Sequence, residues 1–235
     1  AALRGVRERA GSDAVELVIV DMSLQESIRR MAATFLAKHG TLDVLIHNAG
    51  VLANERTTTP EGHELTFATN VLGPFALTRL LLPKLKERNG RVVTVSSGGM
   101  YTQSLDTSVL RGEGADFSGV TAYAQTKRAE VLLNELWAAR EPEVMFAAMH
   151  PGWADTPGVA RSLPTFYRLM KRLLRTPDEG ADTIVWLAAC PRIAQMSGLF
   201  WFDRTIAPTH VFPKIRETPE EREQLWTWLS SACAC

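Results

Sequence analysis

Cysteine, tyrosine and net charge are all scarce in this sequence. The 235 residues include only three cysteines (Cys190, Cys233 and Cys235) and three tyrosines, and 26 basic residues balance 26 acidic ones. An odd cysteine count without framework spacing argues against a disulfide-stapled secreted domain. The tail Cys233-Ala234-Cys235 does not have the order of a prenylation motif. The balanced charge gives no overall field to attract nucleic acid or an anionic membrane.

Long apolar runs and targeting signals are also missing from the pattern of residues. No apolar run approaches the length of about 20 residues that a membrane-spanning helix needs. No secretory signal is visible, so we expect a cytoplasmic location, with the reservation that an upstream signal would lie outside this sequence. Hydrophobic residues make up 46% and charged residues 22% of the chain. This balance and length predict one globular α/β domain over residues 1–235.

Helix-like and strand-like hydrophobic periods alternate along the chain. Buried strands are predicted at 15–20, 42–46, 91–95, 144–149 and 198–202. Between them the pattern predicts helices at 2–9, 23–39, 59–85, 123–139 and 176–190, and a last helix from Thr218. A loop and a short amphipathic helix are predicted over 157–175. Helix starts are indicated by Thr59-Pro60-Glu61 and by capping boxes at Ser23/Glu26, Thr176/Glu179 and Thr218/Glu221. The alternation predicts a doubly wound, mostly parallel sheet with right-handed crossovers.

Chemically useful residues gather where the predicted strands end, which is where ligands bind in such sheets. Tyr123 and Lys127 lie one helical turn apart and leave the same helix face. A phenol is a weak acid near neutrality, and a nearby ammonium stabilises its phenolate. The pair is therefore suited to move a proton to or from a carbonyl or alcohol oxygen, which the hydroxyl of Ser97 would hold. Taken alone, a Tyr-x-x-x-Lys pattern is more often a half-buried ring beside a solvated lysine.

The combination of motifs is more specific than any one of them. Asn48-Ala49-Gly50, Asn70, Ser97, Tyr123-x-x-x-Lys127 and Pro151-Gly152 stand in the order typical of the short-chain dehydrogenase/reductase family, which the chain resembles from about Val15 onward. The resemblance implies a Rossmann-like fold and an NAD(P)-dependent oxidoreductase that interconverts a carbonyl and an alcohol. It slightly favours NADP and implies no metal.

The resemblance also implies a role for each matching residue. Tyr123 would be the general acid/base, Lys127 would also hold the nicotinamide ribose, Ser97 would orient the substrate carbonyl, and the backbone carbonyl of Asn70 would hold a water. The implied cofactor-binding residues are Asp21, Asn48, Ala49, Gly50, Tyr123, Lys127, Pro151, Gly152 and Thr156.

The substrate pocket is expected between two variable segments. Residues 101–119 form one predicted rim and residues 159–175 the other. Leu163, Phe166, Tyr167 and Met170 in the second rim favour an apolar small-molecule substrate, although they would equally serve to seat a short helix. A homo-oligomer is retained as a candidate assembly. The family usually has Asn where His47 stands.

A further absence concerns the family's Gly-rich turn, which places backbone N–H groups and a helix N-terminus on the cofactor's pyrophosphate. Neither this turn nor the first two strands and first helix of the fold can be found in the sequence. We expect an incomplete domain, in which strand 15–20 is isolated or pairs directly with strand 42–46, with weak cofactor binding and low solubility. A truncated, non-catalytic isoform that acts by protein interaction is therefore an alternative. A third reading, an NAD-dependent epimerase, shares Tyr-x-x-x-Lys but not the Asn48-Ala49-Gly50 and Pro151-Gly152 signatures.

Overall fold

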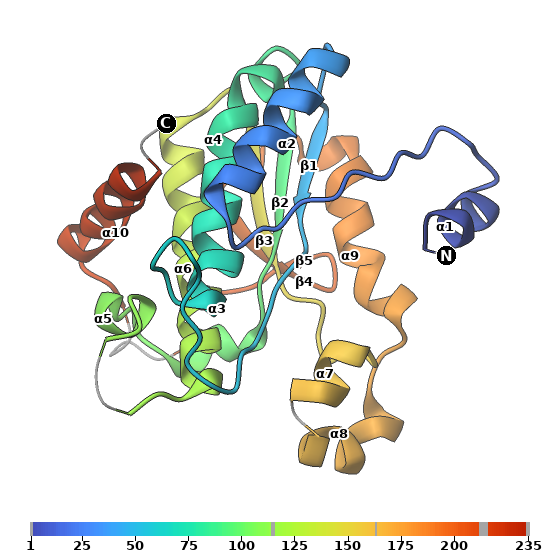
Figure 1. The fold of residues 1–235 in the computed structure, drawn as a ribbon. Helices are drawn as coiled ribbons and strands as arrows, with labels where there is room; N and C mark the ends of the chain where they lie inside the picture. Colours follow the sequence, from blue (N-terminus) through green and yellow to red (C-terminus); the bar gives the residue numbers. More distant parts are fainter. Residues whose placement is uncertain (1, 114–115, 163, 212–215, 234–235) are drawn as a thin grey trace.

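The computed structural model describes residues 2–113, 116–162, 164–211 and 216–233 (Figure 1). Its strands are β1 (Val44–His47), β2 (Arg91–Val95), β3 (Met145–Met149), β4 (Leu199–Phe202) and β5 (Thr205–Ile206). Its helices are α1 (Ala2–Ala10), α2 (Gln25–Lys38), α3 (Leu65–Phe67), α4 (Gly73–Lys86), α5 (Thr107–Leu110), α6 (Gly119–Arg140), α7 (Pro157–Ser162), α8 (Pro164–Met170), α9 (Pro177–Ala189) and α10 (Pro219–Ala232).

The sheet has its strands in chain order, β1-β2-β3-β4-β5. The first three pairings are parallel, and the short β5 adds an antiparallel edge through the pairs Trp201–Ile206 and Phe202–Thr205. Helices connect the parallel strands, as such crossovers require. The predicted α/β class and parallel sheet are thereby confirmed, and the carboxyl ends of β1, β2 and β3 lie at one edge of the sheet.

Helices cover both faces of the sheet (Figure 1). On one face, α4 and α6 pack against the strands, and their core includes Phe75, Leu132 and Phe146. The outer helices α2 and α10 extend the same core. On the other face, α9 packs on β2 and β3 and contributes Leu187. Burial on both faces explains why the parallel strands read as continuous apolar runs rather than as alternating patterns.

The predicted strand at 15–20 is wrong. The segment is extended but joins no strand, and Leu17, Val18 and Ile19 are 57%, 45% and 81% exposed. A side chain of α1 binds the start of the segment, because Arg7 donates two hydrogen bonds to the carbonyl of Val15. A strand needs a neighbouring strand to which its backbone can bond. Within the described residues, no strand lies between this segment and β1, and no backbone hydrogen bond joins the two. Figure 1 shows the segment leading away from the sheet to α1, which buries no residue.

Two predicted helix starts are also wrong, because in each case a glutamate other than the predicted capping residue binds the first N–H groups of the helix. No side chain of its own caps α2; instead, the carboxylate of Glu61 accepts hydrogen bonds from the N–H groups of Gln25 and Glu26 at 2.8 and 3.2 Å. The next helix begins at Leu65 rather than near Thr59, because Glu64 caps it. Glu61 thus serves a distant helix. The capping boxes that open α9 and α10 are confirmed.

The helical run from Leu65 to Lys86 is long and apolar enough, by length and composition, to cross a membrane. It contains α3, a π-helical segment (Ala68–Leu72) and α4. The expectation that no stretch approaches the length of a membrane span is therefore not met by length and composition alone. Of its most apolar window, 72% is buried inside the molecule, as expected for a helix of the core.

Candidate active site

Three of the predicted site residues, Gly50, Asn70 and Tyr123, lie around the buried end of Lys127 on α6. Gly50 follows β1, and a methyl group placed on it would lie 3.5 Å from Lys127 Nζ and 3.4 Å from Asn70 Oδ1. The Lys127 ammonium donates to the carbonyl of Val95, the last residue of β2, at 2.9 Å. Its nitrogen lies 5.4 Å from the centroid of the Tyr123 ring. Residues from β1, β2, α6 and the π-helical segment therefore meet at one point.

Glu130 is the residue of this cluster that the sequence pattern did not single out. Its Oε1 accepts a hydrogen bond from Lys127 Nζ at 2.7 Å, and both side chains are about 5% exposed or less. Its Oε2 is buried and has no hydrogen-bond partner among the described residues. Its spacing could have indicated it, because Glu130 follows Lys127 by three residues and therefore lies on the same side of α6, where both are buried.

The electrostatics of this pair follow from burial. Burial raises the pKa of Glu130 to about 7, even though the Lys127 charge and hydrogen bond act in the opposite direction. For Lys127, burial alone would lower the pKa, but the charges of Glu130 and Tyr123 and the Glu130 hydrogen bond together raise it. Lys127 is thus held as an ammonium, next to a carboxyl that exchanges its proton near neutral pH.

Asn70 is held by a set of hydrogen bonds within the π-helical segment. Its side-chain amide accepts from the N–H of Val51 at 2.8 Å and donates to the carbonyl of Val51 at 2.9 Å. It also donates to Thr126 Oγ1, which in turn donates to the carbonyl of Tyr123. The side chain of Asn70 therefore fastens the loop after β1 to helix α6. A π segment at such a position is typical of functional sites.

His47, where the family usually has Asn, lies behind this cluster. Its Nε2 is 2.7 Å from Thr78 Oγ1, and burial lowers its pKa to about 4, so the ring is neutral near pH 7. A cavity of about 30 Å³ is lined by His47, Thr78, Asn70 and Glu130 together with apolar side chains. It has room for a water molecule and the polar groups to hold one.

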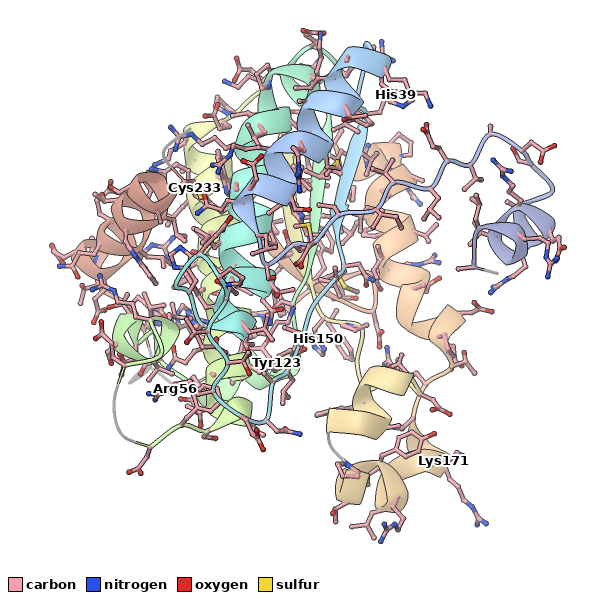
Figure 2. The ribbon with its side chains drawn as sticks, in the orientation of Figure 1. His39, Arg56, Tyr123, His150, Lys171 and Cys233 are labelled. Carbon is pink, nitrogen blue, oxygen red and sulfur yellow. The ribbon has the colours of Figure 1, made fainter. Side chains whose placement is uncertain are left out.

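Ser97 lies at the carboxyl end of β2 but is less tightly held. Its hydroxyl caps a short 3-10 turn by accepting from the N–H of Gly99 at 3.3 Å. The neighbouring Ser96 donates to the carbonyl of Lys127 at 2.8 Å and thereby joins this strand end to α6. No hydrogen bond between Ser97 and Tyr123 is present within the described residues. Tyr123 is half-buried, and Figure 2 shows it at the same end of the molecule as His150.

The segment after β3 forms the next part of the site. Gly152 has a φ of +73°, and a methyl group on it would lie 2.8 Å from the guanidinium of Arg175, so only glycine fits there. Pro151 precedes it and accepts from Arg175 through its carbonyl. Thr156 caps α7, because its Oγ1 accepts from the N–H of Val159 at 3.4 Å.

Asp21 and the Asn48-Ala49-Gly50 segment are placed at the edge of the site. Asp21 is exposed, and its Oδ1 accepts from the N–H and hydroxyl of Ser23 at 2.9 and 2.7 Å. The chain beside it is packed tightly, because a methyl group on Gly73 would lie 2.2 Å from the carbonyl of Met22. Asn48, Ala49 and Gly50 are all exposed and present their backbone to the surface beside Lys127.

The two predicted rims are present but contain short helices. The 101–119 segment includes α5 and the end of a 3-10 turn rather than a simple loop. In the other rim, the Tyr167 hydroxyl donates to Asp155 at 2.8 Å and Met170 is exposed. Leu163 and the side chain of Phe166 lie outside the part of the chain that the structure describes.

Comparisons with known proteins agree with this geometry. The family model described as short chain dehydrogenase matches residues 2–165. Dehydrogenase/reductase SDR family member 12 from Bos taurus is 46% identical over 94% of this chain, and the human protein of that name is 44% identical over the same share. Human polyprenol dehydrogenase is 35% identical. The chain covers 70% of the length of each of these three relatives.

Solved structures show the same fold. A crystal structure of an uncharacterized protein from Mycobacterium paratuberculosis has a TM-score of 0.70 and 27% identity, and the match covers 98% of this chain and 81% of that one. A short-chain dehydrogenase from Shigella flexneri, solved in complex with NADP, has a TM-score of 0.66 and 22% identity over 84% of this chain and 78% of its own. The sequence identity, the fold and the residues gathered around Lys127 agree, and the chain belongs to the short-chain dehydrogenase family of oxidoreductases.

Proposed function

We propose that this chain carries the proton-transfer site of an NAD(P)-dependent oxidoreductase that interconverts a carbonyl and an alcohol on an apolar small molecule. The observation that supports it best is the Lys127 ammonium, which lies 5.4 Å from the Tyr123 ring centroid and beside the bare backbone of Gly50. A cation in that position stabilises a phenolate, which is the form that accepts a proton from an alcohol.

Each residue then has a chemical task. The Tyr123 hydroxyl gives its proton to the carbonyl oxygen in the reduction and takes it back in the oxidation. The Ser97 hydroxyl holds the same oxygen where negative charge develops. Lys127 places its positive charge near the Tyr123 ring, and Asn70 holds the loop after β1 in place through Val51. The dinucleotide, when bound, supplies or accepts the hydride.

The residues fit one half of the dinucleotide well. Gly50 leaves room for a sugar to approach the Lys127 ammonium, because it has no side chain to fill that space. We propose Asn48, Ala49, Gly50, Tyr123 and Lys127 for the nicotinamide ribose half, with Pro151, Gly152 and Thr156 on the nicotinamide side and Asp21 on the adenine side. The 235 residues contain no Gly-rich turn for the pyrophosphate. Preference for NADP over NAD is part of the proposal and rests on the resemblance within the family.

An apolar substrate is supported by the exposed Trp153 and Met170 beside the site. It is supported as well by human polyprenol dehydrogenase, whose name gives a long apolar alcohol as its substrate. We therefore propose a ketone, aldehyde or alcohol attached to a hydrocarbon body as the substrate class.

The test is a reduction assay of the chain with NADPH and NADH against a panel of apolar ketones and aldehydes. We expect slow turnover at high cofactor concentration, because no Gly-rich turn holds the pyrophosphate, with NADPH faster than NADH. Tyr123→Phe should lose at least about a hundredfold of that activity, since general acid–base catalysis contributes about 10²- to 10⁴-fold. Tyr101→Phe is the matched control, because the Tyr101 hydroxyl bonds to the carbonyl of Pro208 instead. Full activity in Tyr123→Phe would overturn the mechanism. Absence of both turnover and calorimetric NADPH binding would favour the non-catalytic alternative.

A further inference from the structure

The charge balance of the whole chain conceals a strongly basic segment. Residues 157–176 contain five basic residues and no acidic one, in a chain whose formal net charge is zero. This segment includes α7, α8 and the 3-10 turn Lys171–Leu173 that follows α8. Figure 1 shows α8 at the outer end of the molecule, away from the sheet and its covering helices, and Figure 2 places Lys171 there.

The same segment exposes large apolar side chains. Leu169 is 77% exposed and Leu173 is 76% exposed, and Met170 between them is 36% exposed. Leu169 lies in the last turn of α8, and Leu173 ends the 3-10 turn that follows, so both are exposed at the C-terminal end of the segment. None of the three contributes to the hydrophobic clusters that the described residues form in the core. Fully exposed leucines on a helix end are unfavourable in water unless something covers them.

The basic residues lie directly beside the leucines. Arg168 precedes Leu169 in α8, and Arg172 precedes Leu173 in the 3-10 turn. Both arginines are exposed, as is Lys171, and within the described part of the chain none of these three forms an ion pair. Arg175, in contrast, is paired with Asp203. The segment therefore exposes two large apolar side chains and three positive charges without ion-pair partners among the described residues, all within a few residues of one another.

We propose that the α8 segment, residues 164–173, docks on the surface of an anionic lipid bilayer. An amphipathic helical segment with leucines on one side and arginines or lysines beside them lies in the plane of such an interface, with its apolar side chains among the acyl chains. Basic side chains bind the anionic headgroups. The segment projects outward and is not a groove, so its shape suits a flat surface. Because the segment carries basic residues and no acidic ones, it complements a uniformly anionic surface better than a protein partner of mixed charge.

A further contact supports the same orientation. The backbone carbonyl of Trp153 accepts from the N–H of Arg175, directly after the proposed docking segment, and the Trp153 side chain is 49% exposed. Tryptophan is enriched at the level of lipid headgroups, where its ring is partly in an apolar environment. Docking through α8 would bring the rim of the proposed site next to the bilayer, from which an apolar substrate would enter.

The proposal is tested by flotation of the purified chain with vesicles of phosphatidylcholine alone or of phosphatidylcholine mixed with phosphatidylserine. We expect binding to the mixed vesicles only, weakening as salt rises because the Debye length shortens. The double variant Arg168→Glu/Arg172→Glu should lower binding at least about tenfold, since each basic residue contributes about fivefold. Leu169→Ser/Leu173→Ser should lower it comparably.

Two matched controls should bind as the unmodified chain does. Arg4→Glu/Arg9→Glu makes the same change of charge on α1, and Val185→Ser removes an apolar side chain that is 61% exposed on α9. Circular dichroism and thermal midpoints confirm folding; if the leucine variant fails to fold, the arginine variant decides, because it changes only exposed side chains.

Equal binding to both kinds of vesicle, absence of binding, or unchanged binding in the α8 variants would overturn the proposal. Light scattering tests self-association. If the chain self-associates without binding vesicles, and the α8 variants abolish that self-association, the α8 segment binds a second copy of the chain instead of a bilayer. None of these measurements depends on turnover, so they stand or fall separately from the proposed reaction.

Discussion

At the scale of single residues, two buried titratable groups share one cavity and respond to pH in opposite directions. Burial raises the pKa of Glu130 from 4.5 to about 7 and lowers the pKa of His47 from 6.5 to about 4. The folded state therefore binds a proton on Glu130 more tightly than the unfolded chain does, and binds one on His47 less tightly. The stability contributed by Glu130 is present below pH 4.5 and lost as the pH rises to about 7. That contributed by His47 is present above pH 6.5 and lost as the pH falls to about 4.

Single substitutions should separate these two effects. Relative to the unmodified chain, Glu130→Gln should gain unfolding free energy as the pH rises from 4.5 to about 7. His47→Gln should gain it as the pH falls from 6.5 to about 4. Each gain should reach up to about 3 kcal/mol. Urea unfolding at several pH values measures the differences, and Glu220→Gln, on the exposed side of α10, controls for loss of a carboxylate. A pH-independent difference in both variants would contradict the assigned shifts.

Several residues of the site were predictable because spacing and strand ends bring them together. The sequence placed Gly50, Asn70, Tyr123 and Lys127 in one crevice, and the structure confirms their proximity. Glu130 was not predicted, because a glutamate three residues after a lysine is usually a solvated surface pair. Only the packing of α6 on the sheet shows that both charges are buried.

At the scale of elements, helix α6 is tied to the C-terminal part of the chain by a buried ion pair. Arg128, the residue after Lys127, is fully buried, and its Nε and Nη2 donate to the carboxylate of Glu217 at 2.5 and 2.7 Å. Its Nη1 donates to the carbonyl of Thr209, and its Nη2 also contacts His210. The pKa of Glu217 is lowered, because the hydrogen bonds from Arg128 and His210 outweigh a large opposing effect of burial. The pair fixes the position of α6 next to the site.

Removing one partner of this pair should be strongly destabilising. Arg128→Met leaves the Glu217 carboxylate buried without its counter-charge, and we expect the unfolding free energy to fall by about 3–5 kcal/mol. Adding Glu217→Gln should restore part of the loss, because no unbalanced charge then remains. Urea unfolding of Arg128→Met, Glu217→Gln, the double variant and the unmodified chain measures these steps. A double variant as unstable as the sum of two single losses would show that the ion pair is not the cause.

Elements were predictable where their own residues decide their conformation. The strands at 91–95, 144–149 and 198–202 and the capping boxes before α9 and α10 depend on local pattern and chemistry, and they are confirmed. The predicted strand at 15–20 failed because a strand depends on a partner. The start of α2 depends on Glu61, which lies more than thirty residues away in the chain and which no local rule connects to it.

At the scale of the whole molecule, strand β1 forms an exposed edge of the sheet within the described residues. Within the described residues β1 pairs only with β2, and Ile46 on it is 42% exposed. The segment with Leu17 and Ile19, which joins no strand, adds further exposed apolar surface. Exposed strand edges and apolar extended segments pair with other chains, so this side of the molecule favours association.

Charges placed on this segment should therefore improve solubility without changing the fold. We expect Leu17→Lys/Ile19→Lys to reduce concentration-dependent light scattering and to leave the thermal midpoint unchanged, because both side chains are exposed. Val185→Lys, on the α9 surface, adds a charge elsewhere and should have a smaller effect. Equal improvement in the two proteins would mean that net charge, rather than this edge, controls association.

The chain order of the sheet has a consequence for how the molecule folds. Because each of β1, β2, β3 and β4 pairs with the strand that follows it in the chain, the sheet is able to grow in the direction of synthesis, one crossover helix at a time. Each parallel pairing still joins residues far apart in the chain, such as Val44 with Arg91 and Arg91 with Met145, and such long-range pairing slows folding. The last helix, α10, completes the core through Leu225 and Leu229. A ribosome-bound chain that has not yet released α10 should therefore already hold Tyr123 and Lys127 against a formed three-stranded sheet.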